Sequence, residues 1–153
     1  MLACVKVTSL KHAIVALACV GASITSTGMN KDDDLHGAWT CISATVDGKA
    51  LSKDTAAALR LTITQDRYKT EKPGEVLFDS TYRVDASRSP RQINMVGTEG
   101  DLKGKEAQGI YSIEKDILRI CYTMPGGGRP ERFESHPGSK AYLVVWKRER
   151  NKG

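Results

Sequence analysis

The sequence predicts an all-β fold, a small up-and-down antiparallel β-barrel of about eight strands with one short helix after the first strand. Three observations predict it. After residue 35, short runs of alternating apolar and polar residues are separated by turn residues, which is the pattern of half-buried strands. No long segment follows the helical period. A Trp opens this β region and an Arg closes it, where the first and last strands of a closed barrel are neighbours.

The chain has 153 residues, enough for one domain that buries a single core. Its net charge of +5 is too small to indicate a nucleic-acid partner, which usually shows as Lys and Arg clustered on one face. The basic residues 147–152 are interpreted as a solubilising end after the last strand.

The N-terminal residues 1–22 predict a secretory signal peptide, and therefore export to the periplasm or the extracellular space. Lys6 and Lys11 supply the positive region, and the apolar run over residues 13–22 is shorter than the roughly 20 residues of a transmembrane helix. No transmembrane segment is predicted. Small residues before Ser23 suit cleavage there.

A lipid anchor at Cys19 is the alternative for this end of the chain. Leu17-Ala18-Cys19 resembles the end of a lipobox, although Ala16 is smaller than the residue usual at its position. The polar residues 23–34 are predicted to form a flexible tether, and residues 35–149 the barrel domain.

The elements of the domain follow in order. The first strand, over residues 38–46, ends at Asp47-Gly48, a dipeptide typical of a tight hairpin turn. Ser52 can cap a short helix over residues 52–59, which contains three successive alanines. Alternation predicts seven further strands, over residues 59–64, 68–71, 76–84, 93–96, 108–113, 117–123 and 142–148. A long glycine-rich loop over residues 125–139 separates the last two.

Gly37, Trp39 and Arg148 are the candidate residues for barrel closure. Trp39 starts the first strand and Arg148 ends the last, so a closed barrel brings both to the same rim. A guanidinium stacked on an indole contributes roughly 0.5–2 kcal/mol and covers the barrel base.

Several short motifs together resemble the uncharacterised lipocalin-like domain family that is abundant in planctomycete bacteria. They are Leu35-x-Gly37-x-Trp39, Asp47-Gly48-Lys49, Leu61-x-Ile63, Asp66-Arg67-Tyr68, Gly109-Ile110-Tyr111, Asp116-x-Leu118-x-Ile120-Cys121, Arg129-Pro130-x-x-Phe133 and Lys147-Arg148. The resemblance covers residues 35–149 and implies export and a calycin-type barrel, but no activity. Cys41 departs from the aliphatic residue expected there, whereas Cys121 matches.

Residues with the spacing that catalysis requires are absent from the sequence. His36 and His136 have no metal-binding spacing, and no nucleophile elbow, P-loop or dinucleotide fingerprint occurs. The sequence therefore predicts neither an enzyme nor a bound cofactor or metal.

Three strand tyrosines are the first candidate ligand-binding residues: Tyr82, Tyr111 and Tyr122. A tyrosine inside a barrel offers an apolar ring and one hydroxyl, which suits a mixed pocket. The alternative is that all three are ordinary core residues.

Arg129 and Phe133 in the long loop complete the candidate site. Phe133 is expected to anchor the loop over the barrel mouth, so that Arg129 points toward an acidic ligand group. The alternative for Arg129 is a structural ion pair with Glu131 or Glu134.

Cys41 and Cys121 are predicted to be free thiols. An exported protein with two cysteines often forms a disulfide. Here Cys41 shares a face with Trp39, whereas Cys121 lies on the face opposite Leu118 and Ile120. The two sulfurs therefore lie on opposite sides of the barrel wall, where they cannot be joined.

The function predicted from these features is that of a non-enzymatic exported binding module for a small amphipathic ligand. The alternative is an interaction or scaffold domain with a filled barrel and no ligand, because eight short strands leave an interior that side chains alone can fill.

Overall fold

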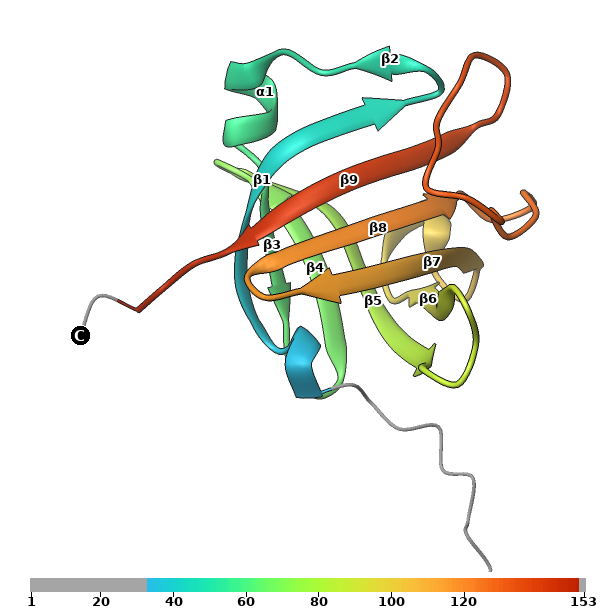
Figure 1. The fold of residues 1–153 in the computed structure, drawn as a ribbon, viewed down its shortest axis with the longest axis horizontal. Coiled ribbons are helices and arrows are strands. Elements are labelled where there is room, and N and C mark those ends of the chain that lie inside the picture. Colours follow the sequence, from blue (N-terminus) through green and yellow to red (C-terminus); the bar gives the residue numbers. More distant parts are fainter. Residues whose placement is uncertain (1–32, 152–153) are drawn as a thin grey trace, which may run out of the picture.

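The protein folds into a closed antiparallel β-barrel in the computed structural model, which describes residues 33–151 (Figure 1). The strands are β1 Gly37–Val46, β2 Lys49–Ala50, β3 Arg60–Ile63, β4 Arg67–Lys72, β5 Glu75–Asp85, β6 Arg91–Gly97, β7 Glu106–Glu114, β8 Ile117–Thr123 and β9 Ala141–Arg148. The helical segments are α1 Lys53–Ala57 and the short 3-10 turns η1 Asp33–Leu35 and η2 Gly100–Leu102. The predicted signal peptide, Cys19 and all but the end of the predicted tether lie outside the described residues.

Eight of these strands form the barrel, and β1 closes it by pairing with β9. Each strand from β3 to β8 pairs with the next along the chain, and the first part of β1 pairs with β3. All pairings between these strands are antiparallel. The predicted all-β barrel of eight strands is therefore confirmed.

The segment between β1 and β3 forms a flap at one end of the barrel. Asp47 and Gly48 have positive φ angles of 48° and 79°, and this tight turn pairs the end of β1 with β2. Ser52 caps α1, because its hydroxyl accepts a hydrogen bond of 3.2 Å from the Thr55 N–H. The helix is shorter than predicted, and β2 was not predicted because two exposed residues show no alternation.

Large side chains fill the interior of the barrel. The inward-facing residues of β1 and β9 include Trp39 and Trp146, both at most 1% exposed. Tyr68 from β4 and Tyr111 from β7 are equally buried. The interior also contains Leu61, Ile63, Phe78, Tyr82, Val84, Ile93, Met95, Leu118, Ile120 and Val144.

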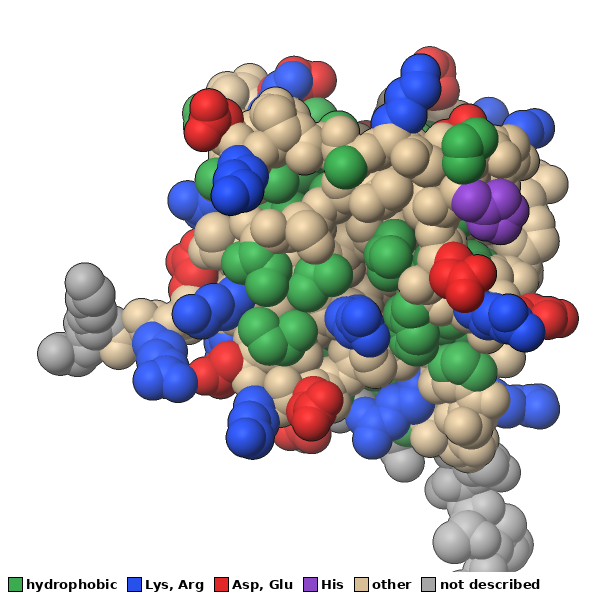
Figure 2. All heavy atoms as spheres, turned by 45° about the horizontal axis from the view of Figure 1, so that its top comes forward, with side chains coloured by type: hydrophobic (Ala, Val, Ile, Leu, Met, Phe, Trp, Pro, Cys, Tyr) green, Lys and Arg blue, Asp and Glu red, His purple; other side chains and the backbone are tan. Residues whose placement is uncertain are grey.

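A second, smaller apolar cluster lies on the outside of the barrel wall. Ile110, Cys121 and Ala141 face outward from β7, β8 and β9 and are nevertheless buried. The loop between β8 and β9, residues 124–140, covers them with Phe133. Figure 2 looks onto this side of the molecule, where further hydrophobic side chains gather on the surface with charged side chains around them.

The base of the barrel is closed by Arg148, which lies over the Trp39 ring with its Cζ atom 4.1 Å from the ring centroid. The predicted pairing of residues 39 and 148 is also present. The guanidinium donates to the carbonyl oxygens of His36, at 2.6 Å, and Asp34. Gly37 is required here, because its φ of +139° disfavours side chains and a Cβ atom would lie 3.1 Å from the Arg148 guanidinium.

Replacing Arg148 by Ala is expected to lower the free energy of unfolding by about 1–2 kcal/mol. The substitution removes a cation over an indole and the donor for two carbonyl groups. Urea denaturation measures the loss, with Arg83→Ala as the control because Arg83 is an exposed strand arginine.

Arg148→Met separates packing from hydrogen bonding, since it keeps an apolar side chain over Trp39. We expect it to recover little of the loss. An Arg148→Ala variant as stable as the parent would remove the closing role of this contact.

Candidate functional site

The three candidate tyrosines contribute to the core. Tyr82 and Tyr111 are at most 3% exposed, and the Tyr82 hydroxyl donates to the carbonyl oxygen of Thr64 at 2.8 Å. Tyr122 is partly buried and stacks on Tyr142, with the ring centroids 5.1 Å apart. Burial raises the pKa of Tyr122 well above its ordinary value. These side chains fill the barrel, which matches the alternative of ordinary core residues.

Arg129 lies on the outer wall, so the expectation that it points into a barrel mouth is wrong. Its guanidinium donates to the carbonyl oxygens of Gly109 at 2.7 Å and Ile93 at 3.2 Å, and to Oδ1 of Asn94 at 2.6 Å. Asn94 alternates with the inward-facing Ile93, so these contacts lie on the outside. Arg129 forms no ion pair with Glu131 or Glu134 either, because two backbone carbonyl oxygens and the Asn94 side chain hold its guanidinium.

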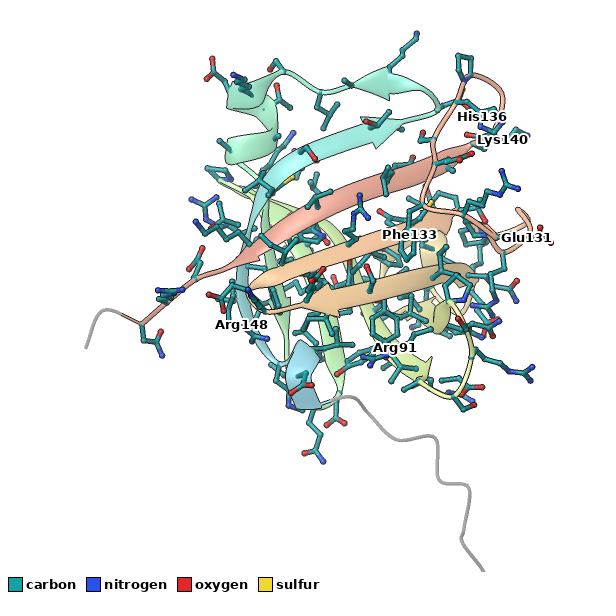
Figure 3. All side chains as sticks on the ribbon, in the orientation of Figure 1. Arg91, Glu131, Phe133, His136, Lys140 and Arg148 are labelled. Carbon is teal, nitrogen blue, oxygen red and sulfur yellow. The ribbon has the colours of Figure 1, made fainter. Side chains whose placement is uncertain are left out.

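Phe133 also lies on the outer wall and not over a barrel end. It packs on Ile110, Cys121 and Leu143, which face outward. Figure 3 shows Phe133 over the strands of this wall, whereas His136 and Lys140 lie farther along the loop. Arg129 and Phe133 together hold the loop on the outer face. The sequence pattern does not reveal this position of the loop, because both faces of residues 117–123 are partly apolar and alternation alone does not show that a loop covers the outer one.

The two cysteines lie on opposite sides of the wall, as predicted. Cys41 belongs to the interior core and Cys121 to the outer cluster, and both are free. Each sulfur donates weakly to a backbone carbonyl oxygen, Cys41 to Ser43 and Cys121 to Glu134. Burial raises the pKa of the Cys41 thiol to about 11 and also raises that of Cys121. Neither thiol is activated for nucleophilic chemistry.

The outer face of β8 and β9 continues beyond the loop, and there it is uncovered. The register pairs Ile117 with Lys147 and Arg119 with Val145. These four residues alternate with Leu118 and the other inward-facing residues, so all four face outward. They form a block with the two apolar side chains on one diagonal and the two cations on the other. We call it the outer block.

The outer block lines an open hollow of about 650 Å³. The hollow is completed by Ser112, Glu114, Lys115 and Asp116. Ile42, 51% exposed, lies beside Val145 at a bulge in the pairing of β1 with β9. The sequence carried a signal for this surface, since residues 143–145 are continuously apolar and cannot all face inward.

Neither cation of the outer block forms an ion pair with a carboxylate of residues 33–151, although Lys147 lies within electrostatic range of Asp116. Arg119 contacts the Phe133 ring at 5.8 Å, and Lys147 forms no ion pair. The nearby Asp116 is bound by Arg150 at 2.7 Å, and this hydrogen bond lowers the pKa of the Asp116 carboxyl.

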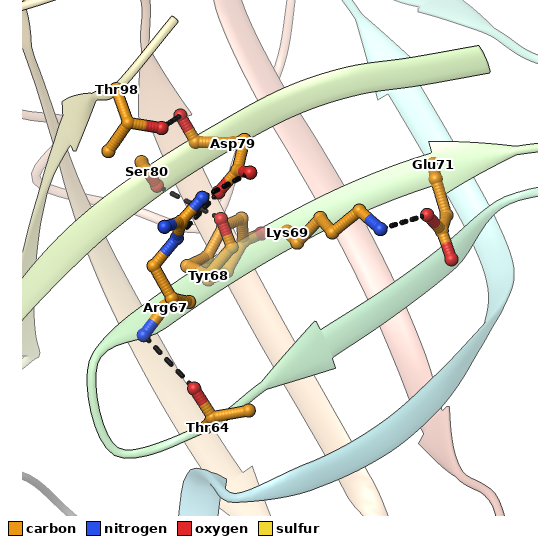
Figure 4. A network of polar contacts seen from close by, with 8 residues as sticks. All are labelled: Thr64, Arg67, Tyr68, Lys69, Glu71, Asp79, Ser80 and Thr98. Atoms are coloured by element: carbon orange, nitrogen blue, oxygen red, sulfur yellow. Dashed lines mark hydrogen bonds and ion pairs between the residues drawn. The ribbon is translucent and has the colours of Figure 1, made fainter.

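On the wall formed by β4 and β5, two cations are neutralised by acidic neighbours (Figure 4). Arg67 forms a two-pronged ion pair with Asp79, and Lys69 pairs with Glu71 at 2.6 Å. The outer block differs from this part of the wall in having its two cations beside two apolar side chains and in no ion pair.

Within residues 33–151, no three His, Cys, Asp or Glu side chains are grouped so that they could hold a metal ion. No helix in the same range is long and apolar enough to cross a membrane.

Alkylation tests the two thiols. After denaturation without reductant, the peptides that contain Cys41 and Cys121 should both carry the alkyl group, whereas the native protein should react slowly because both thiols are buried and protonated. Mass spectrometry of the digested protein reads both results. If the two peptides were instead unlabelled and joined by a disulfide, the prediction of two free thiols would be contradicted.

Comparison of the chain with protein-family models, with curated proteins and with solved structures finds no significant match.

Proposed function

We propose that this protein is a non-enzymatic exported binding module of the lipocalin-like type, and that it binds a small amphipathic molecule on the outer wall of its barrel. The observation that carries the proposal is the outer block, an uncovered apolar surface with unpaired cations in an open hollow.

The filled interior supports the choice of the outer wall. A ligand chamber needs space inside the barrel, but the centre is occupied by Trp39, Trp146 and the buried tyrosines. An interior ligand would have to displace these side chains, and opening a packed core by one large side chain costs about 3–5 kcal/mol. A hollow of about 650 Å³ lies within the range of small-molecule sites.

The alternative is an interaction domain with a filled barrel and no small ligand. The filled core is equally compatible with a module that binds a ligand on its outer wall and with an interaction domain. The hollow favours the first, because partner proteins usually meet surfaces that are larger and flatter than this one.

Binding of octyl glucoside, a neutral amphiphile, tests where such a molecule lies. Isotope-labelled protein is titrated below the micelle concentration, and the amide and indole proton–nitrogen signals are followed. We expect the largest shifts at Ile117, Arg119 and Val145, and unchanged indole signals of Trp39 and Trp146. The Trp146 indole is a sensitive reporter of an interior ligand, because its N–H has no hydrogen-bond partner in the described structure.

Two matched variants complete the test. Val145→Asp should weaken binding about tenfold or more, because it places a charge on the apolar diagonal. Val76→Asp should not, although Val76 is an exposed valine of another wall, 49% exposed. Shifts centred on the two indoles and insensitive to Val145→Asp would place the ligand inside the barrel and overturn the proposal.

A further inference from the structure

We infer that the amphipathic molecule is an anion, a single-chain carboxylate whose head group is held between Arg119 and Lys147. This inference rests on the proposed function and adds the charge of the ligand and the residues that select it.

The geometry of the outer block places both cations within reach of one head group. Arg119 and Lys147 are diagonal neighbours across the pairing of β8 with β9. Side chains at such positions arise from backbone points roughly 7–8 Å apart, which long cationic side chains bridge easily. A carboxylate between them can accept two parallel hydrogen bonds from the Arg119 guanidinium and one from the Lys147 ammonium.

The other diagonal provides the surface for the tail. Ile117 and Val145 are partly exposed on the outer face, and Ile42 extends the apolar surface toward β1. Ile117 and Val145 lie on the same face of the sheet as the two cations, each beside one of them in a cross-strand pair. A molecule with its charge at one end and its apolar chain at the other can therefore contact both diagonals at once.

The neighbouring contacts explain why these two cations remain available to an anion. Asp116, an acidic residue of the same hollow that also acts electrostatically on Lys147, is already bound by Arg150 and lies 4.0 Å from Arg148. Phe133 contacts one side of the Arg119 guanidinium and limits its movement without neutralising its charge. The position of Arg119 is thus restricted before the ligand arrives, which lowers the entropy cost of binding.

A dissolved monomer fits this surface better than a membrane. The site is a hollow, whereas a lipid surface is flat on this scale.

The test compares three amphiphiles with the same octyl tail: octanoate, octyl glucoside and octyltrimethylammonium. Each is titrated below its micelle concentration into the full chain, and the amide signals of the outer block are followed. We expect octanoate to bind roughly tenfold more tightly than octyl glucoside, since its hydrogen bonds are charge-assisted, and the cationic amphiphile to bind most weakly.

A charge-matched pair of variants separates the site from the net charge of the protein. Arg119→Gln combined with Lys147→Gln should abolish the preference for octanoate and keep binding of octyl glucoside. Arg83→Gln combined with Lys105→Gln removes the same charge from exposed positions elsewhere and should keep the preference. All four substituted residues are exposed or partly exposed, so the variants should fold, and their amide spectra verify this.

The outcomes distinguish the inference from the proposed function. Equal binding of all three amphiphiles at the outer block would overturn the inference and leave the proposed function standing. Absence of any shift at the outer block would overturn both. Binding to vesicles of phosphatidylcholine and phosphatidylglycerol, without binding of octanoate, would replace the dissolved ligand by a membrane surface and also overturn the inference. If the control variant also lost the preference for octanoate, the preference would follow the net charge of the protein alone. That result would overturn the inference.

Discussion

The barrel closes where β1 pairs with β9, and Arg148 stacked on Trp39 covers the base of this seam. The two residues lie opposite each other where β1 pairs with β9, at the base of the barrel. The guanidinium covers the edge of the core with a flat cation that still reaches water, and its N–H groups satisfy carbonyl groups of the entering chain. Without this seam the sheet would have two open edges, which β proteins have to protect against pairing with other chains.

The closed ring limits where the ligand of the proposed function could lie. Eight strands enclose an interior that side chains just fill, and the two tryptophans occupy much of it. The polar groups inside are mostly paired, as in the hydrogen bonds of Tyr82 with Thr64 and of Ser80 with Tyr68. A fold of this size therefore presents its distinctive chemistry on the outside of the wall.

The loop between β8 and β9 divides that outside into two parts. One part is covered by Phe133 and belongs to the stable structure, with Arg129 fastened to the backbone of β6 and β7. The other part, the outer block, has the same mixture of apolar and cationic residues but no cover. The covered part and the outer block therefore differ because of how far the loop extends over the strands. The composition of the strands does not cause the difference.

Sequence reasoning predicted the barrel, its seam and the separation of the cysteines because each depends on local alternation. The order of the strands alone was enough to predict that Trp39 and Arg148 lie together. The positions of Arg129 and Phe133 were wrong because a loop of this length can fold over an end or a side, and its choice depends on contacts with distant residues such as Asn94 and Ile110. The outer block was missed for a similar reason: its diagonals exist only in the register between β8 and β9.

Native-state hydrogen exchange tests the central claim, that the seam is an integral part of one closed barrel. The amides that join β1 to β9 should exchange as slowly as those that join β7 to β8, because both then open only when the whole domain unfolds. Seam amides that exchange at a much lower opening free energy than those of β7 and β8 would contradict the account, since the barrel would then behave as an open sheet.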